Sequence, residues 1–265
     1  MIKKIIQRGP HYLKVFNKLN RQDVILVSYP KSGNTWIRNI LANYIGLTEL
    51  NKDKITFKEL DEIMPGLGRE DFFQKWTYTV PKFSATHLKY ILLFKKTKNV
   101  LVIRDPRDVM VSYFYYLNKK KNGFYFENIY DLLIHPKFGL KSWFKHTMSW
   151  FGNIDFLIVY EEMLYDDDSI MEDLFKKIGS DFQKSKLYLA VENSRFKNFK
   201  KIEEKYGHSK PETITKDFSF ARKGESGDYL NHFDKRCEKY YEKCLNEFGF
   251  DDYDAILNML KKSCY

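Results

Sequence analysis

A lysine, two hydroxyl side chains and a glycine stand together early in the chain, in the segment Lys31–Thr35 (Lys-Ser-Gly-Asn-Thr). A positive charge, hydroxyl donors and a backbone that can turn sharply are the groups that bind a phosphate-like anion. Before them, residues 24–29 form an apolar, largely β-branched run typical of a strand buried on both faces. From Asn34 the apolar residues follow helical spacing. Since a helix that starts after a tight turn directs free N–H groups at an anion, this segment predicts a phosphate cradle.

The order of residues differs from that of the common Walker A loop, in which a glycine and four further residues precede Gly-Lys-Ser or Gly-Lys-Thr. Lys31 comes before Gly33, and no earlier glycine is spaced to match. A P-loop-type kinase or phosphotransferase with Mg²⁺ is therefore an alternative that the order disfavours. The plain structural alternative is a buried strand and a helix joined by a turn of small residues.

Two further groups could bind anions. Arg104 and Ser112 are eight positions apart, so a strand ending at Arg104 would place Ser112 about two turns into the next helix. A guanidinium and a hydroxyl can then reach one anion. The segment 222–224 (Arg-Lys-Gly) offers two charges and a backbone N–H. The alternatives are an ion pair of Arg104 with Asp105 or Asp108, and a basic surface turn at 222–228.

His87 is the candidate general base. Of the six histidines, it alone stands at the predicted end of a sheet strand and follows a threonine. An imidazole can accept a proton near neutral pH, where a hydroxyl group is a poor nucleophile. Because a single histidine in a sequence is more often structural, this assignment depends on what surrounds it.

The elements that must position these residues alternate between strands and helices. Buried strands are predicted over 24–29, 82–87, 99–104 and 155–160, and helices over 34–45, from 106 onward and from 161 to 178. This pattern predicts an α/β fold, with a mainly parallel sheet and helices on both faces. In such a sheet, ligands bind beyond the carboxyl ends of the strands. The last third is predicted to be helical, over 183–193 and 228–261, with an irregular basic segment at 218–233.

The composition sets limits on location and partners. The chain has 265 residues, 45 Lys and Arg against 35 Asp and Glu, and a formal net charge of +10. A basic balance suits a polyanionic ligand, and a nucleic-acid-binding protein is a second alternative, although the cations gather into three anion-sized groups. Three cysteines without a paired framework indicate a reducing compartment. With no signal peptide and no apolar run long enough to span a bilayer, we expect a soluble, cytoplasmic protein with no membrane or nucleic-acid partner.

Three segments closely resemble motifs of one enzyme family. Residues 29–36 (Tyr-Pro-Lys-Ser-Gly-Asn-Thr-Trp) are similar to the segment that binds the 5′-phosphosulfate in cytosolic sulfotransferases. Residues 102–112 are similar to the family segment that binds the 3′-phosphate, and residues 222–229 to its Arg-Lys-Gly-x-x-Gly-Asp-Trp signature, with Tyr229 in place of Trp. These enzymes transfer a sulfuryl group from 3′-phosphoadenosine-5′-phosphosulfate (PAPS) to an acceptor and release PAP.

The resemblance implies a P-loop-like fold in one domain over 1–265, with a PAPS-binding core at about 24–233 and no metal. It implies that His87 removes the acceptor's proton and Lys31 stabilises the leaving phosphate. Ser112 would contact Lys31 and hold it away from the bridging oxygen. The cofactor-binding residues that it implies are Lys31, Ser32, Gly33, Asn34, Thr35, Trp36, Arg104, Ser112, Tyr160, Ser194, Phe196, Arg222, Lys223 and Gly224.

Two positions depart from the family pattern. Ala85 stands where steroid and phenol enzymes of the family carry a lysine two residues before the histidine. Asp234-Lys235 stands where the family's dimerisation segment has Thr-Val, so dimerisation by that route is not assumed. The sequence predicts a small-molecule hydroxyl acceptor, with an amine as a further option. It leaves open which acceptor, and whether the protein binds PAPS without turnover.

Overall fold

A four-stranded parallel sheet forms the centre of the protein. The structure, a computed structural model, describes residues 14, 17–64, 66–67, 75–121, 124–208, 211–215, 218–219 and 222–264. The strands are β1 (Val24–Ser28), β2 (Phe83–Thr86), β3 (Lys98–Ile103) and β4 (Phe156–Val159), and their order in the sheet is β2-β1-β3-β4. All pairs are parallel, so the four carboxyl ends meet at one edge.

Helices make up most of the rest of the described chain. They are α3 (Asn34–Ile45), the π-helix η1 (Gly46–Leu50), α4 (Phe57–Ile63), the 3₁₀ helix η3 (Leu92–Lys96), α5 (Pro106–Lys119), α6 (Ile129–Ile134), α7 (Leu140–Ser149), α8 (Tyr160–Met163), α9 (Asp167–Lys177), α10 (Lys184–Ser194), α11 (Phe196–Tyr206), the 3₁₀ helices η4 (Pro211–Thr213) and η5 (Asp228–Asn231), α12 (Lys235–Phe248) and α13 (Tyr253–Lys262).

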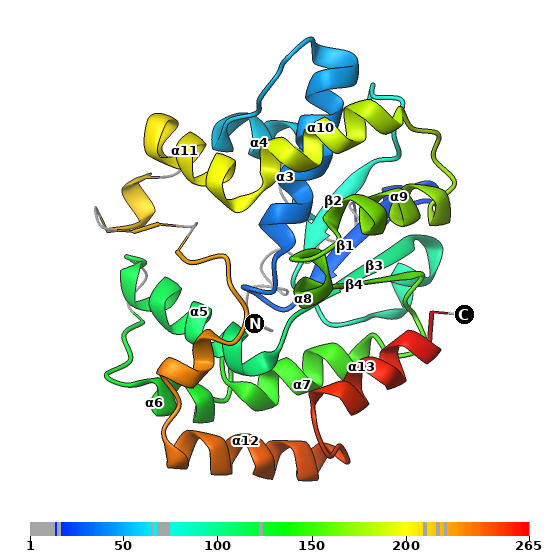
Figure 1. Cartoon of the computed structure of the whole chain (residues 1–265). Coiled ribbons are helices and arrows are strands. Elements are labelled where there is room, and N and C mark those ends of the chain that lie inside the picture. The colour runs from blue at the N-terminus through cyan, green and yellow to red at the C-terminus, as the bar shows by residue number, and fades with distance from the viewer. Residues whose placement is uncertain are drawn as a thin grey trace.

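The two faces of the sheet bury alternate residues of each central strand. In β1, Val24 and Leu26 belong to one apolar core, and Ile25 and Val27 belong to the other. This follows from the two-residue period of a strand. Helices α3, α9 and α10 cover the first face, and α5, α7, α12 and α13 cover the second (Figure 1). Both faces are therefore dry, which explains the continuous apolar runs of the strands.

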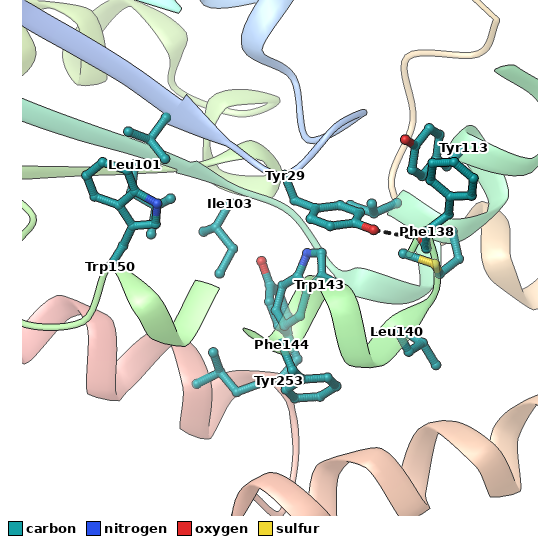
Figure 2. Close-up of a cluster of buried hydrophobic side chains, with 14 of the residues drawn as sticks. Tyr29, Leu101, Ile103, Tyr113, Phe138, Leu140, Trp143, Phe144, Trp150 and Tyr253 are labelled. Atoms are coloured by element: carbon teal, nitrogen blue, oxygen red, sulfur yellow. Dashed lines mark hydrogen bonds between the residues drawn. The ribbon is translucent and has the colours of Figure 1, made fainter. Parts of the chain in front are cut away.

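The second core is rich in aromatic rings and supports the carboxyl edge of the sheet. Figure 2 shows Tyr29, which follows β1, lying among Tyr113, Phe138 and Trp143. The Tyr29 hydroxyl donates a hydrogen bond of 2.7 Å to the Phe138 carbonyl, so the chain leaving β1 is fixed to the start of α7. This contact joins the turn after β1 to the helices below the sheet.

The predicted fold class is confirmed, with two boundaries that were wrong. The predicted helix over 228–261 is divided into η5, α12 and α13, because Gly249 ends α12 at a φ of 80° and Asp252 accepts the N–H of Ala255 to begin α13. The predicted helix over 161–178 is α8 and α9, since Asp166 caps a new helix by accepting from the Ser169 N–H. In both cases a short polar residue competes for the backbone and restarts the helix.

Among the described residues, no helix is long and apolar enough to cross a membrane.

Candidate active site

One cavity of about 1010 Å³ opens at the carboxyl edge of the sheet. Residues that follow the strands line it: Lys31 three residues after β1, and His87, Arg104 and Tyr160 directly after β2, β3 and β4. Of the fifteen residues that the sequence singled out, fourteen line this cavity; Ser32 is the exception and lies buried within the turn. The sheet therefore brings together residues more than 190 positions apart in the sequence.

The turn between β1 and α3 is strained. Lys31 has a φ of 75° and Gly33 a φ of 104°, both in the left-handed region that costs other residues free energy. A Cβ at Gly33 would lie 2.8 Å from the Tyr160 ring, so only glycine fits here. The Ser32 hydroxyl is buried and has no hydrogen-bond partner within the described chain. A buried polar atom without a partner marks a place where a ligand or water belongs.

Lys31 lies half-buried between cations. Its Nζ is 4.6 Å from the centre of the Tyr116 ring. Burial, followed by the charges of Arg104 and Arg222, lowers the pKa of Lys31 to about 7. Near neutral pH both the charged and the neutral form of Lys31 are therefore populated, and a bound anion would favour the charged form.

His87 lies at the cavity wall with one ring nitrogen engaged. Its Nδ1 is 2.7 Å from the Ser28 carbonyl oxygen, and the Ser28 hydroxyl is 3.3 Å away. Because a carbonyl only accepts, Nδ1 carries the proton and Nε2 is left with its lone pair. Burial, and next the nearby charges of Arg38 and Lys31, lower the pKa of His87 despite the bond to Ser28. The imidazole is thus neutral at pH 7 and able to accept a proton.

Arg104 and Ser112 lie on the strand–helix unit that the sequence predicted. Arg104 is 7% exposed, and its guanidinium stacks 4.2 Å over the centre of the Tyr160 ring. It donates 2.7 Å to the Glu225 carbonyl and lies 3.4 Å from Asp108 Oδ2. The ion pair with Asp108, weighed as an alternative, is therefore present, while Arg104 still lines the cavity with Ser112.

Asp108 ties the segment 222–229 to α5, a role that sequence reasoning missed. Its two carboxylate oxygens accept the N–H groups of Gly227 at 2.8 Å and of Tyr229 at 2.9 Å. The carboxylate is 1% exposed. The Asp-Pro-Arg-Asp sequence announced a helix start, and nothing in it pointed to a loop 119 residues later.

The segment 222–225 carries its own internal anchor. Arg222 and Lys223 both form ion pairs with Asp228, and although burial opposes ionisation, these partners hold the pKa of Asp228 well below its usual range. Gly224 has a φ of 69°, and a Cβ there would lie 2.3 Å from the Phe196 ring. The two cations are thus presented to the cavity on a loop that these contacts hold in place. Residues 220–221 of the predicted basic segment lie outside the described residues.

The aromatic residues expected near an adenine line the same region. Trp36 and Tyr160 meet edge to face with ring centres 5.8 Å apart. Ser194 also lines the cavity, but its hydroxyl donates to the Ala190 carbonyl at 2.8 Å within α10. Phe196 begins α11 beside Gly224. We call this region, around Arg104 and Arg222, the arginine end of the cavity.

The other part of the cavity, which we call the aromatic end, was only partly foreseen. The rings that line it come from α5, from the segment between α5 and α6, and from the segment before α7; they are Tyr113, Tyr116, Phe124 and Phe138. Arg38, Lys120 and Lys137 also line the cavity, and no motif marked them. Residues 68–74 lie outside the described chain. Within the described chain, no group of three His, Cys, Asp or Glu side chains could hold a metal ion.

Comparison with known proteins places this geometry in context. Residues 21–249 match the model of a family described as Sulfotransferase domain. Human Sulfotransferase 2A1 is 28% identical over 240 residues, covering 85% of this chain and 84% of that protein. The 3-beta-hydroxysteroid sulfotransferase of Cavia porcellus is 28% identical over 243 residues, covering 85% and 83%. The crystal structure of mouse sulfotransferase SULT7A1 complexed with PAP has a similar fold, with a TM-score of 0.68 at 22% identity over 97% of this chain and 94% of that one.

Proposed function

Because the chain belongs to the sulfotransferase family, we propose that its cavity binds PAPS and transfers the sulfuryl group to a hydroxyl group of a small molecule. The arginine end would hold the nucleotide: Arg104 and Ser112 the 3′-phosphate, and the turn at 31–35 the 5′-phosphosulfate. Trp36, Tyr160 and Phe196 would surround the adenine. The relatives' names include a steroid sulfotransferase, which supports an alcohol as the acceptor.

The observation that carries the proposal is the pairing of a neutral imidazole with a half-buried lysine in one cavity. The Ser28 carbonyl fixes the His87 tautomer so that Nε2 can take the acceptor's proton. The acceptor oxygen then forms a bond to sulfur as the bond between sulfur and the 5′-phosphate oxygen breaks. Lys31 and the N–H groups of the turn would stabilise the charge that grows on that leaving oxygen. The products are a sulfate ester and PAP.

Ser112 is proposed to act through Lys31. It lies on the side of α5 that lines the cavity. A hydroxyl in this position can accept a hydrogen bond from the Lys31 ammonium and hold it away from the bridging oxygen until an acceptor arrives. This would limit hydrolysis of PAPS by water.

The direct test uses radiolabelled PAPS with a panel of phenols and alcohols, with PAP binding measured by calorimetry. We expect PAP to bind without added metal, and label to pass to at least one acceptor. PAP binding without transfer to any acceptor would favour a PAPS-binding protein without turnover. Failure to bind PAP, together with Mg²⁺-dependent hydrolysis of ATP, would favour the kinase alternative.

We also propose that residues 1–265 form one domain and that the protein is cytoplasmic. The described cysteines, Cys237, Cys244 and Cys264, are free thiols, which a reducing compartment preserves. Asp234 accepts the Cys237 N–H at 2.8 Å and caps α12. The residue that replaces the family's dimerisation threonine thus has a local structural role.

A further inference from the structure

The aromatic end of the cavity carries two lysines, and no carboxylate of the described chain forms an ion pair with either of them. Lys120, half-buried at the end of α5, donates a 2.8 Å hydrogen bond to the Tyr116 hydroxyl. Lys137 lies at the rim, with its Nζ 5.3 Å from the centre of the Phe124 ring and 4.9 Å from that of Phe138. Neither lysine has an ion pair with a described carboxylate. A cation that makes only ring and hydroxyl contacts keeps most of its capacity to bind an anion.

Three side-chain carboxylates line the cavity among the described residues, and two of them are paired. The third, Glu225, is exposed and lies at the arginine end, where its backbone carbonyl accepts from Arg104. Asp61 accepts from Arg38 at 3.1 Å, and Asp167 accepts from Arg195 at 2.9 Å. Within each pair the two charges balance each other. Besides burial, the charges that act on Lys31 are mixed: those of Arg104, Arg222 and, least of all, Lys120 lower its pKa, and that of Glu203 raises it. Among the described side chains, the charges at the aromatic end are those of Lys120 and Lys137, and both would repel a protonated amine.

The shape of this end adds a second requirement. Tyr113 and Phe138 meet edge to face at 5.7 Å, and Phe124 and Phe138 at 4.7 Å, so the wall beneath the lysines is aromatic and apolar. The Tyr29 hydroxyl bond to the Phe138 carbonyl holds this wall on the core. A ligand that satisfies both features has an apolar ring body and an anionic group beyond it.

We propose that the acceptor is an anionic hydroxyl compound: a ring-bearing alcohol or phenol with a carboxylate that Lys120 binds, assisted at the rim by Lys137. The assignment rests on the proposed sulfuryl transfer, because it names the molecule whose hydroxyl faces His87. It makes Lys120 a specificity-determining residue. An amine acceptor is disfavoured by the same charges.

A matched series tests the charge preference: 3-(4-hydroxyphenyl)propanoate, its amide, and 3-(4-hydroxyphenyl)propylamine. We expect kcat/KM to fall about tenfold from the carboxylate to the amide, the effect of one charge-assisted hydrogen bond, and further to the amine. Lys120→Glu should reverse the order, and Lys120→Met should remove the preference. Lys121→Glu changes the same charge one residue along, on an exposed side chain outside the cavity, and should keep the wild-type order.

The same three compounds are titrated into the PAP-loaded protein, so that the order is measured even where turnover is slow. Equal affinity for the carboxylate and the amide, or no change of order in Lys120→Glu, would overturn the proposal while PAP binding and transfer stand. A protein that binds no PAP and transfers no label overturns the proposed function as well. Lys120→Glu must retain the wild-type affinity for PAP for its reversed order to count.

Discussion

The two ends of the cavity are held in place by different kinds of interaction. At the arginine end, buried ion pairs and backbone hydrogen bonds join α5, the segment 222–229 and Tyr160. At the aromatic end, rings pack edge to face on the core, and the lysines above them make no ion pair with described residues. Hydrogen bonds and ion pairs are directional, so they fix the positions of the charged groups. Ring packing fixes only the shape of the wall, and other apolar rings can pack against it. We therefore expect the arginine end to be selective for one ligand and the aromatic end to accept a class of ligands.

Removing His87, the proposed base, should have the largest effect, and it should affect turnover without affecting nucleotide binding. His87→Ala deletes the Nε2 acceptor, and we expect kcat to fall about 10²- to 10⁴-fold, the usual contribution of a general base. PAP affinity should be unchanged, because His87 belongs to the acceptor's side. His87→Gln keeps a donor for the Ser28 carbonyl and should be as inactive. Wild-type turnover in either variant, measured with labelled PAPS, would contradict the assignment.

Replacing Asp108, the buried carboxylate at the arginine end, should have the next largest effect, on the affinity for PAP. In Asp108→Asn, one of the two N–H groups of Gly227 and Tyr229 loses its acceptor, and Arg104 loses a negative charge. We expect PAP to bind about 30-fold more weakly, the effect of about 2 kcal/mol for a lost bond to a charged group. Calorimetry measures this. Asp173→Asn, at an exposed pair on α9, is the control, and equal losses in the two variants would refute a specific role.

Two glycines of the same loop distinguish steric fit from backbone conformation. Gly224→Ala introduces a Cβ against the Phe196 ring, and left-handed backbone is strained for alanine, so we expect about tenfold weaker PAP binding. Gly227 has a φ of 84°, but nothing lies within 4 Å of its added Cβ. Gly227→Ala should therefore lose less affinity. If Gly227→Ala lost more affinity for PAP than Gly224→Ala, the close contact with Phe196 would not be what determines the conformation of this loop.

The smallest effect is a pH dependence set by Lys31. Its pKa of about 7 in the free protein must rise when a polyanion binds, so affinity is full below pH 7 and declines above it. From pH 7 to pH 8 we expect PAP affinity to fall about fivefold, as follows from one proton taken up on binding. Lys31→Arg remains charged and should show no such decline. A parallel decline in both proteins would assign the proton to another group.

The sequence predicted the arginine end far better than the aromatic end. Lys31, Arg104 and the segment 222–224 each sit in a short motif that could bind an anion, and the three motifs together, in the order of one family, indicated the site. All three line one cavity. Asp108 was visible only as a partner of Arg104, because its bonds to Gly227 and Tyr229 depend on tertiary packing.

The aromatic end had no such signal. Lys120 and Lys137 lie on separate elements, one ending α5 and the other preceding α7, and only their packing places both on one cavity. In the sequence Lys120 belongs to the run Lys119–Lys121, which is typical of a solvated surface. The hydrophobic periodicity of a helix does not show which lysine in such a run faces inward.

The order of the strands has a consequence for how this protein is made. β1 is synthesised first but lies inside the sheet, paired with residues 83–86 and 98–102, and β4 completes the sheet at Val159. Pairings between strands so far apart in sequence form slowly, because the chain between them loses conformational entropy before the strands make any stabilising contact. During translation β1 and the turn at 31–35 therefore leave the ribosome long before β2 and β3, the two neighbours of β1 in the sheet, have been synthesised. Until then an apolar β1 without neighbours is exposed, which makes early nascent chains the stage at which a chaperone is most needed.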